Sequence, residues 1–351
     1  MTSSLQPTDS LQFGEALSGM PEQLAAAHEA AGKVDAAALP DAADFDHIVT
    51  LGMGGSGIAG NIVQAVGTAT LPVPLTVLKH YRTPAFVGPR TLAFALSYSG
   101  DTEETLEMAR GALAAGARLV TISNGGELAR LAAESGSLHV PCPDGIVMPR
   151  SALGALVAPL VVVLFRMGML PEAHAGLMRA QQQLARRRDQ CKPAADAARN
   201  PARELARKIG RTIPVIYGSG GLGGVAALRW KQSVNENAKA PAYWNEYPEL
   251  DHNEVCGWGQ HGDVTRQIFT LVELRHGLEH PRLEQRAVAT RELIEEALCQ
   301  VLTVEAEGEG RLAQLLDLIH LGDWTSYYLA LDNDVDPGPI DAIMQLKAAI
   351  G

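Results

Sequence analysis

The segment that decides the fold class is Asp46-His-Ile-Val-Thr-Leu-Gly-Met-Gly-Gly-Ser-Gly-Ile-Ala-Gly60. Its first half is a short apolar run and its second half is rich in glycine, which predicts a buried strand that turns directly into a helix. A similar segment, Tyr217-Gly-Ser-Gly-Gly-Leu-Gly-Gly-Val-Ala226, follows the apolar run Ile213–Tyr217. Two such strand–turn–helix segments in one chain indicate an internal repeat of two α/β subdomains.

Further apolar runs complete two predicted sets of strands. Those of the first half cover residues 75–78, 91–96, 118–123 and 138–140, and those of the second half cover 268–274 and 298–304. Helical patterns lie between or after them, at 21–39, 102–115, 152–165, 312–331 and 342–350. This alternation predicts parallel, doubly wound sheets flanked by helices. We expect a helical N-terminal segment over 1–40, a first subdomain over 41–175, a helical connection of long solvated helices over 176–210 and a second subdomain over 211–351.

Composition and charge restrict the possible functions. The 351 residues include 29 Lys plus Arg and 40 Asp plus Glu, a net charge of −11, so a nucleic-acid or membrane-surface binder is not expected. The N-terminus lacks the pattern of a signal peptide, and the apolar stretch 152–165 is shorter than the roughly 20 residues of a membrane span. The four cysteines form no Cys-x-x-Cys pair. We therefore expect reduced thiols, a cytoplasmic protein and no zinc site.

The first glycine turn is a candidate phosphate site. Gly54 and Gly55 allow the backbone to approach an anion closely, the following helix start offers free N–H groups, and Ser56 adds a hydroxyl donor. Gly52, Gly54 and Gly57 also fit the G-x-G-x-x-G pattern of dinucleotide-binding proteins, so a nicotinamide dehydrogenase is one alternative. No acidic residue follows at the end of a second strand about 20 residues on, which disfavours that alternative.

A second cluster of donors, Ser97-Tyr-Ser-Gly-Asp-Thr102, follows the predicted strand 91–96 and precedes a helix. It brings Ser97, Ser99 and Thr102 to one helix N-terminus. An ordinary N-cap requires only one hydroxyl, so we interpret the cluster as the second part of a phosphate cradle made of neutral donors. Since the protein is acidic overall, a small ligand with one phosphate is easier to bind than a polyanion.

Together the two motifs resemble the sugar isomerase (SIS) domain, an α/β module that binds phosphosugars. Four further segments are similar to segments of the bifunctional phosphoglucose/phosphomannose isomerase family: Met148–Gly154, Trp230–Ala242, Glu249–Gly257 and Val335–Lys347. They occur in the family's order over nearly the whole chain. The resemblance implies two SIS subdomains, interconversion of glucose 6-phosphate and/or mannose 6-phosphate with fructose 6-phosphate, no cofactor or metal, and a homodimer.

Isomerisation through a cis-enediol requires a base, a group that opens the sugar ring and a cation beside the enediolate. The resemblance assigns these roles to Glu236, His252 and Arg150 in that order, and it gives Lys347 a contact with the substrate. His252 is expected to reach the active site of the partner subunit, and Glu254 to orient His252. Each residue also has a structural interpretation, such as a solvated carboxylate for Glu236 and a loop arginine that caps a helix beginning at Ser151 for Arg150.

Other positions complete the sequence predictions. Gly338 stands where family members often carry Thr, which the resemblance links to acceptance of the mannose epimer, and Asn61 stands where many have Asp and receives no role. His276-Gly-Leu-Glu-His280 matches a zinc-peptidase pattern, but its glycine and the following Pro281 favour a solvated loop without metal. The alternative function is that of a non-catalytic phosphosugar sensor, since SIS modules also occur in regulators.

Overall fold

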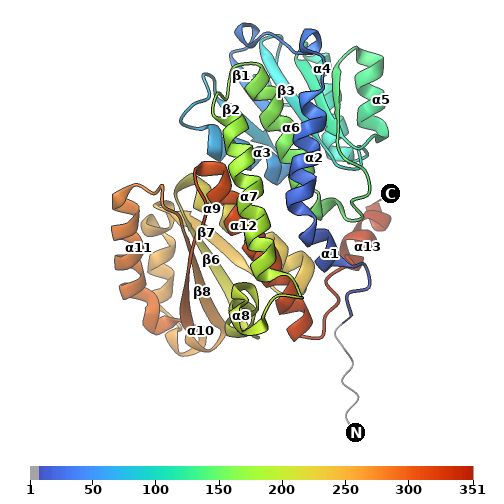
Figure 1. Ribbon diagram of the computed structural model, residues 1–351. Helices are drawn as coiled ribbons and strands as arrows, with labels where there is room; N and C mark the ends of the chain where they lie inside the picture. Colours follow the sequence, from blue (N-terminus) through green and yellow to red (C-terminus); the bar gives the residue numbers. More distant parts are fainter. Residues whose placement is uncertain (1–7, 351) are drawn as a thin grey trace. The chain divides into compact units, whose positions relative to one another are not determined.

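The computed structural model describes residues 8–350, which divide into two compact units. Residues 19–182 form the first unit, and residues 8–18 together with 183–350 form the second unit. Each unit contains one parallel sheet flanked by helices (Figure 1), which confirms the predicted fold class. Among the described residues, no helix is long and apolar enough to cross a membrane.

The first unit contains a five-stranded sheet of order β2-β1-β3-β4-β5 in which all neighbours are parallel. Its strands are β1 (His47–Leu51), β2 (Leu75–Leu78), β3 (Thr91–Leu96), β4 (Arg118–Ser123) and β5 (Leu138–Pro141). All five match the predicted runs. Strand β3 is buried at every residue, as expected of a parallel sheet covered on both faces.

The helices of the first unit form two groups. One group contains α2 (Met20–Gly32), α3 (Gly54–Gly67) and α6 (Leu153–Arg166), and the other contains α4 (Glu103–Ala114) and α5 (Gly126–Ser135). The crossovers through α3 and α4 run in opposite directions along the sheet, so right-handed connections place these helices on opposite faces. The predicted helix 21–39 was too long, because Asp35 accepts a hydrogen bond from Ala37 N and starts a separate 3₁₀ turn.

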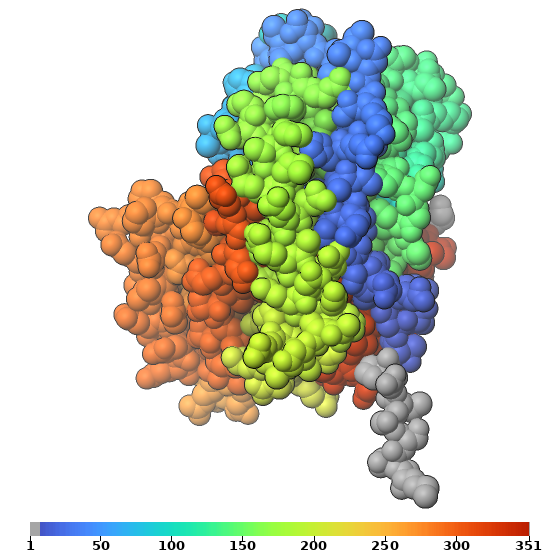
Figure 2. Space-filling model, viewed as in Figure 1, coloured from blue at the N-terminus to red at the C-terminus, as the bar shows by residue number. Residues whose placement is uncertain are grey.

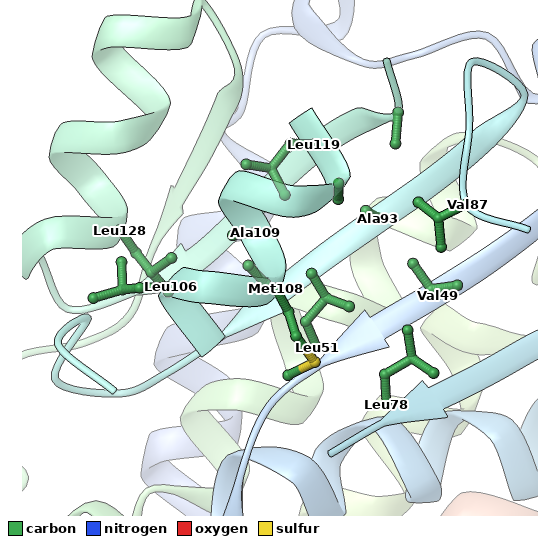
Figure 3. Close-up of a cluster of buried hydrophobic side chains, with 13 residues drawn as sticks. Val49, Leu51, Leu78, Val87, Ala93, Leu106, Met108, Ala109, Leu119 and Leu128 are labelled. Carbon is green, nitrogen blue, oxygen red and sulfur yellow. The ribbon is translucent and has the colours of Figure 1, made fainter. Parts of the chain in front are cut away.

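A cluster of buried apolar side chains joins α4 to the sheet (Figure 3). Val49 and Leu51 of β1 lie on the same face as Leu106 and Met108 at α4, and all four are at most 6% exposed. Each fully buried side chain of this size contributes about 1.5–3 kcal/mol relative to an exposed one. This packing fixes the register of β1 against its neighbours and therefore the position of the turn that follows it.

The second unit repeats the strand order of the first. Its sheet has the order β7-β6-β8-β9, all parallel, with β6 (Ile213–Ser219), β7 (Tyr243–Tyr247), β8 (Phe269–Arg275) and β9 (Gln300–Glu305). This is the order β2-β1-β3-β4 again, and the turn glycines Gly54 and Gly220 have nearly equal φ angles of 50° and 52°. The structure thus confirms the repeat. Strand β7 was missed, because Tyr-Trp-Asn-Glu-Tyr is an edge strand with exposed and polar positions.

Among the described residues, seven α-helices belong wholly to the second unit: α1 (Phe13–Ser18), α8 (Pro201–Ile209), α9 (Gly220–Ser233), α10 (Gly262–Ile268), α11 (Pro281–Ile294), α12 (Arg311–Asp332) and α13 (Asp341–Ile350). Helices α8 and α9 each pack against α12, while α11 contacts β6 and β7 (Figure 1). Helix α12 is the central one, since 18 of its side chains from Leu312 to Ala330 are buried.

The segment predicted as long solvated helices contains α7 (Ala173–Cys191), whose surface side is visible in Figure 2, and the short α8. The prediction was wrong for one face of α7, which is buried. Arg187 is 3% exposed there and donates from Nε and Nη2 to the carboxylate of Asp317 at 2.8 Å each. Asp317 is fully buried and also accepts from Gln183 Nε2 at 2.8 Å, so its charge is well compensated.

We predict that Asp317→Ala lowers the free energy of unfolding by about 3–5 kcal/mol, because it removes the buried counter-ion of Arg187 and leaves the guanidinium only the exposed carboxylate of Glu307. Urea unfolding followed by circular dichroism measures this. The control is Glu29→Ala, which breaks the exposed ion pair with Lys33 and should leave the unfolding midpoint unchanged. Equal effects of the two variants would contradict the importance of the buried pair.

Candidate active site

The strand order of the first unit creates a crevice between the carboxyl ends of β1 and β3. Strands β1 and β3 are neighbours, and the chain leaves them toward opposite faces, which is where open α/β sheets bind ligands. The glycine turn after β1 and the hydroxyl cluster after β3 both begin at this point. The main chain confirms their proximity, since a Cβ atom at Gly52 would lie 3.1 Å from Leu96 O.

The hydroxyl groups predicted to bind phosphate lie close together. Ser97 Oγ is 2.8 Å from Thr102 Oγ1 and 3.4 Å from Ser99 Oγ. Thr102 occupies the N-cap position of α4, but its side chain makes no capping hydrogen bond. The simple N-cap interpretation therefore does not account for Thr102, whose hydroxyl bonds to Ser97 Oγ and not to the helix. Backbone N–H groups donate to the other two hydroxyls, Gly100 N to Ser97 Oγ and Asp101 N to Ser99 Oγ.

The loop that carries these hydroxyls is held rigidly by the start of α5. Gly100 has a φ of 81°, and a Cβ atom there would lie 2.0 Å from Gly125 O, so only glycine fits. Its carbonyl accepts from Leu128 N at 3.0 Å, and the Asp101 carboxylate accepts from Glu127 N at 2.9 Å. A loop fixed by its neighbours loses little entropy when it binds an anion.

Arg150 lies beside the glycine turn. A Cβ atom at Gly55 would be 3.3 Å from Arg150 Cα, so the 3₁₀ turn Pro149–Ser151 packs directly on this glycine. Arg150 is 7% exposed. The capping interpretation assumed a helix that begins at Ser151, whereas α6 begins at Leu153. Arg150 lies instead in the turn that packs on Gly55, beside the phosphate motifs of the first unit.

Lys79, which the sequence patterns did not point to, follows β2 directly. Its Nζ donates to Asn61 Oδ1 at 2.6 Å, and its Cε lies 2.9 Å from where a Cβ atom at Gly57 would be. Burial lowers the pKa of Lys79. A dinucleotide-binding protein has an acid at the end of its second strand, so a lysine here argues further against a dehydrogenase. The signal that could have revealed Lys79 is its place in the sequence, as a cation immediately after the apolar run 75–78.

The predicted base lies in the second unit. Glu236 is in a five-residue π-helical turn, Val234–Ala238, that continues α9, whereas the sequence had suggested a polar stretch after the helix. Its neighbours are bonded: Asn235 Nδ2 donates to Ala240 O and Asn237 Nδ2 to Ser326 Oγ, both at 2.9 Å. Within residues 8–350 the Glu236 carboxylate itself has neither hydrogen bond nor ion pair, and the side chain is half-buried. Single π turns of this kind are frequent at functional sites.

The other residues predicted for catalysis lie on the surface of the second unit. His252 ends the 3₁₀ turn Glu249–His252 and is exposed. The expectation that Glu254 orients His252 was wrong, because the two carboxylate oxygens accept from Tyr217 OH and Asn245 Nδ2 at 2.5 Å each. Lys347 lies on α13, which is exposed at all ten residues.

The zinc-peptidase pattern lies in a loop after β8, as predicted, and three of its five residues are exposed. Its first histidine is the exception: His276 is only 7% exposed, and its Nε2 is 2.9 Å from Ser219 O. His280 Nδ1 accepts from Arg282 N at the start of α11, and Glu279 forms a bidentate ion pair with Arg275. These side chains line a small open pocket, and no metal-binding cluster occurs among residues 8–350.

Comparisons with known proteins agree with this fold. Residues 198–350 match the family model of the bacterial phospho-glucose isomerase C-terminal SIS domain. The C-terminal domain of glucosamine-fructose-6-phosphate aminotransferase from Francisella tularensis superposes with a TM-score of 0.70 at 17% identity, covering 93% of this chain and 97% of that one. Both the repeated parallel sheets and this likeness define a protein of the SIS-domain class.

Sequence relatives narrow the assignment. The bifunctional phosphoglucose/phosphomannose isomerase of Caldicellulosiruptor bescii is 34% identical over 95% of this chain and 97% of its own length. The enzyme of the same name from Aquifex aeolicus is 33% identical over 88% of this chain and 91% of its own. The chain belongs to the bifunctional phosphoglucose/phosphomannose isomerase family.

We predict that Thr102→Val weakens binding of fructose 6-phosphate about tenfold or more, because a hydrogen bond to a charged group contributes about 1.5–3 kcal/mol. Isothermal titration calorimetry measures the affinity. Thermal stability should fall only slightly, since Thr102 makes no capping bond and loses only its bond to the Ser97 hydroxyl. Ser137→Ala, elsewhere in the first unit, is the control. A variant that loses stability but retains affinity would show that Thr102 is an N-cap and not a phosphate ligand.

Proposed function

We propose that the protein is an aldose–ketose isomerase that interconverts glucose 6-phosphate and mannose 6-phosphate with fructose 6-phosphate. The observation that carries the proposal is the carboxylate of Glu236, which has no partner within residues 8–350 and lies in a turn whose flanking asparagines are both bonded. A general base requires a free lone pair at a fixed position, and this arrangement supplies both. Membership of the isomerase family supports the same reaction.

The substrate phosphate is bound in the crevice of the first unit. Neutral donors and the start of α3 hold a monoester anion, and such local donors suit a protein of net charge −11. The groups proposed to contact the phosphate are Gly54, Gly55, Ser56, Ser97, Ser99 and Thr102. Arg150 beside Gly55 adds a permanent positive charge at the edge of this cradle.

In the proposed reaction, His252 donates a proton to the ring oxygen and opens the sugar. Glu236 then removes the proton from C2 and returns it to C1, while a proton passes from the oxygen on C2 to that on C1. Arg150 stabilises the enediolate that forms between these steps, and Lys347 contacts the substrate. Oxidation of C2 and reduction of C1 balance within one sugar, so the reaction requires no external electron acceptor.

Both epimers are proposed as substrates, because removal of the C2 proton from glucose 6-phosphate or mannose 6-phosphate gives the same enediol. Gly338 replaces the hydroxyl residue of many relatives, and a Cβ atom there would lie 2.8 Å from Leu11 Cβ. Leu11 therefore occupies the space of the missing side chain. Initial rates with both epimers determine how far this packing alters the ratio of the two activities.

We predict that Glu236→Gln lowers kcat by about 10²–10⁴-fold while substrate binding is retained, since the amide keeps the shape but cannot accept the proton. Fructose 6-phosphate is the substrate, and a coupled assay detects glucose 6-phosphate. Glu292→Gln, an exposed position on α11, is the matched control. Near-normal turnover by Glu236→Gln would refute the assignment of the base. Binding without turnover by the unaltered protein would instead support the phosphosugar sensor.

We further propose a homodimer in which His252 serves the partner subunit's site. His252 is exposed, and one face of α13 presents Ile343, Leu346 and Ile350 to solvent, with exposed fractions of 37%, 62% and 68%. Contiguous apolar side chains on an exposed helix are typical of a protein–protein contact. A second copy of the chain is the partner that the family resemblance implies, and a two-fold dimer lets each subunit complete the other's site.

We predict that inactive Glu236→Gln and His252→Ala subunits restore activity when they are mixed and allowed to exchange. One site of each heterodimer then combines an intact Glu236 with an intact His252, which gives about a quarter of normal activity for random pairing of subunits. Mass measurement by light scattering confirms the dimer. A mixture as inactive as its components, with subunit exchange demonstrated, would place His252 in the site of its own subunit.

A further inference from the structure

Lys239, the residue that follows the π turn of Glu236, has an unusual backbone and an unusual set of partners. Its φ of 52° places it in the left-handed region, where a side chain other than glycine or asparagine is disfavoured. Its ammonium donates to three carbonyl oxygens: Asn237 O at 3.2 Å, Asp336 O at 2.8 Å and Pro337 O at 3.1 Å. Three donors thus meet three acceptors, and two of these acceptors lie almost 100 residues further along the chain.

The segment held by Lys239 is the base of the C-terminal helix. The Asp336 carboxylate accepts from Gly338 N at 2.9 Å and from Ser10 N at 3.3 Å, and Gly338 lies against Leu11. Helix α13 begins at Asp341, and all ten of its residues are exposed. The contacts at residues 336–338 therefore determine where the helix leaves the second unit.

We propose that Lys239 is a positioning residue that latches the C-terminal segment onto the turn of Glu236, so that the base and the helix carrying Lys347 are held in one arrangement. A lysine in the left-handed region strains the backbone, whereas glycine at the same position would not. Its side chain must therefore add more stability than the strained backbone removes, and the three hydrogen bonds to carbonyl oxygens supply that stability. The functional part of this proposal rests on the proposed isomerase reaction.

The first experiment compares Lys239→Gly, Lys239→Met and the control Lys208→Met, which removes an exposed lysine of α8. Hydrogen exchange of residues 336–350 should accelerate about tenfold in both Lys239 variants and not in the control. Lys239→Gly also relieves the backbone strain, so its thermal midpoint should exceed that of Lys239→Met. Unchanged exchange in both variants would overturn the latch, whatever the protein catalyses.

The second experiment measures kcat and KM for fructose 6-phosphate. Both Lys239 variants should lower kcat/KM about tenfold, although Lys239→Gly loses less stability than Lys239→Met; a merely structural role would instead make the loss of activity follow the loss of stability. In a Lys347→Met background, Lys239→Met should cause little further loss, because the two residues act through one segment. Fully additive losses would overturn the coupling. If the unaltered protein lacks turnover while exchange still accelerates, the latch stands and the proposed isomerase function fails.

Discussion

The constraint on which the rest of the structure depends is the strand order at β1 and β3. Two adjacent parallel strands whose connections leave toward opposite faces cannot both be covered by helices at their carboxyl ends, and a crevice results. Buried apolar side chains on both faces fix the register, so the turn after β1 and the loop after β3 must meet. Gly100, whose missing Cβ admits Gly125 O, then locks the loop in place. The clustering of the glycine turn and the hydroxyl groups proposed to bind phosphate is a consequence of this topology.

The second unit shows that the topology alone does not make a binding site. It repeats the strand order and even the φ angle of the turn glycine, yet the residues at the equivalent position bond to one another, His276 to Ser219 O and Arg275 to Glu279. Hydroxyl groups at a helix start can hold an anion, whereas side chains that are already paired with one another have fewer donors left for it. The two units have therefore diverged in the residues that follow their equivalent strands.

The sequence predicted most of the fold because the strands of buried parallel sheets are continuous apolar runs, and eight of the nine were found in this way. It missed β7, whose exposed and polar positions give no such signal. The hydroxyl cluster and the glycine turn were readable as local patterns, but the partners of Arg187 and Glu254 were not. Those bonds join residues between 9 and 130 positions apart, and only the packed chain brings them together.

The turn of Glu236 shows how the carboxylate proposed as the base is positioned without a bond of its own among residues 8–350. Ser233 and Asn237 face α12, where Ser233 Oγ donates to Asp323 Oδ1 at 2.5 Å and Asn237 Nδ2 donates to Ser326 Oγ. Ser233 and Asn237 lie about one helical turn apart. Their bonds to α12 hold both ends of this turn, and the backbone at residue 236 between them is thereby fixed. Had Glu236 been fixed by a cation, its lone pairs would be occupied and its basicity reduced. Fixing the neighbours keeps the carboxylate in place and leaves it free to take a proton.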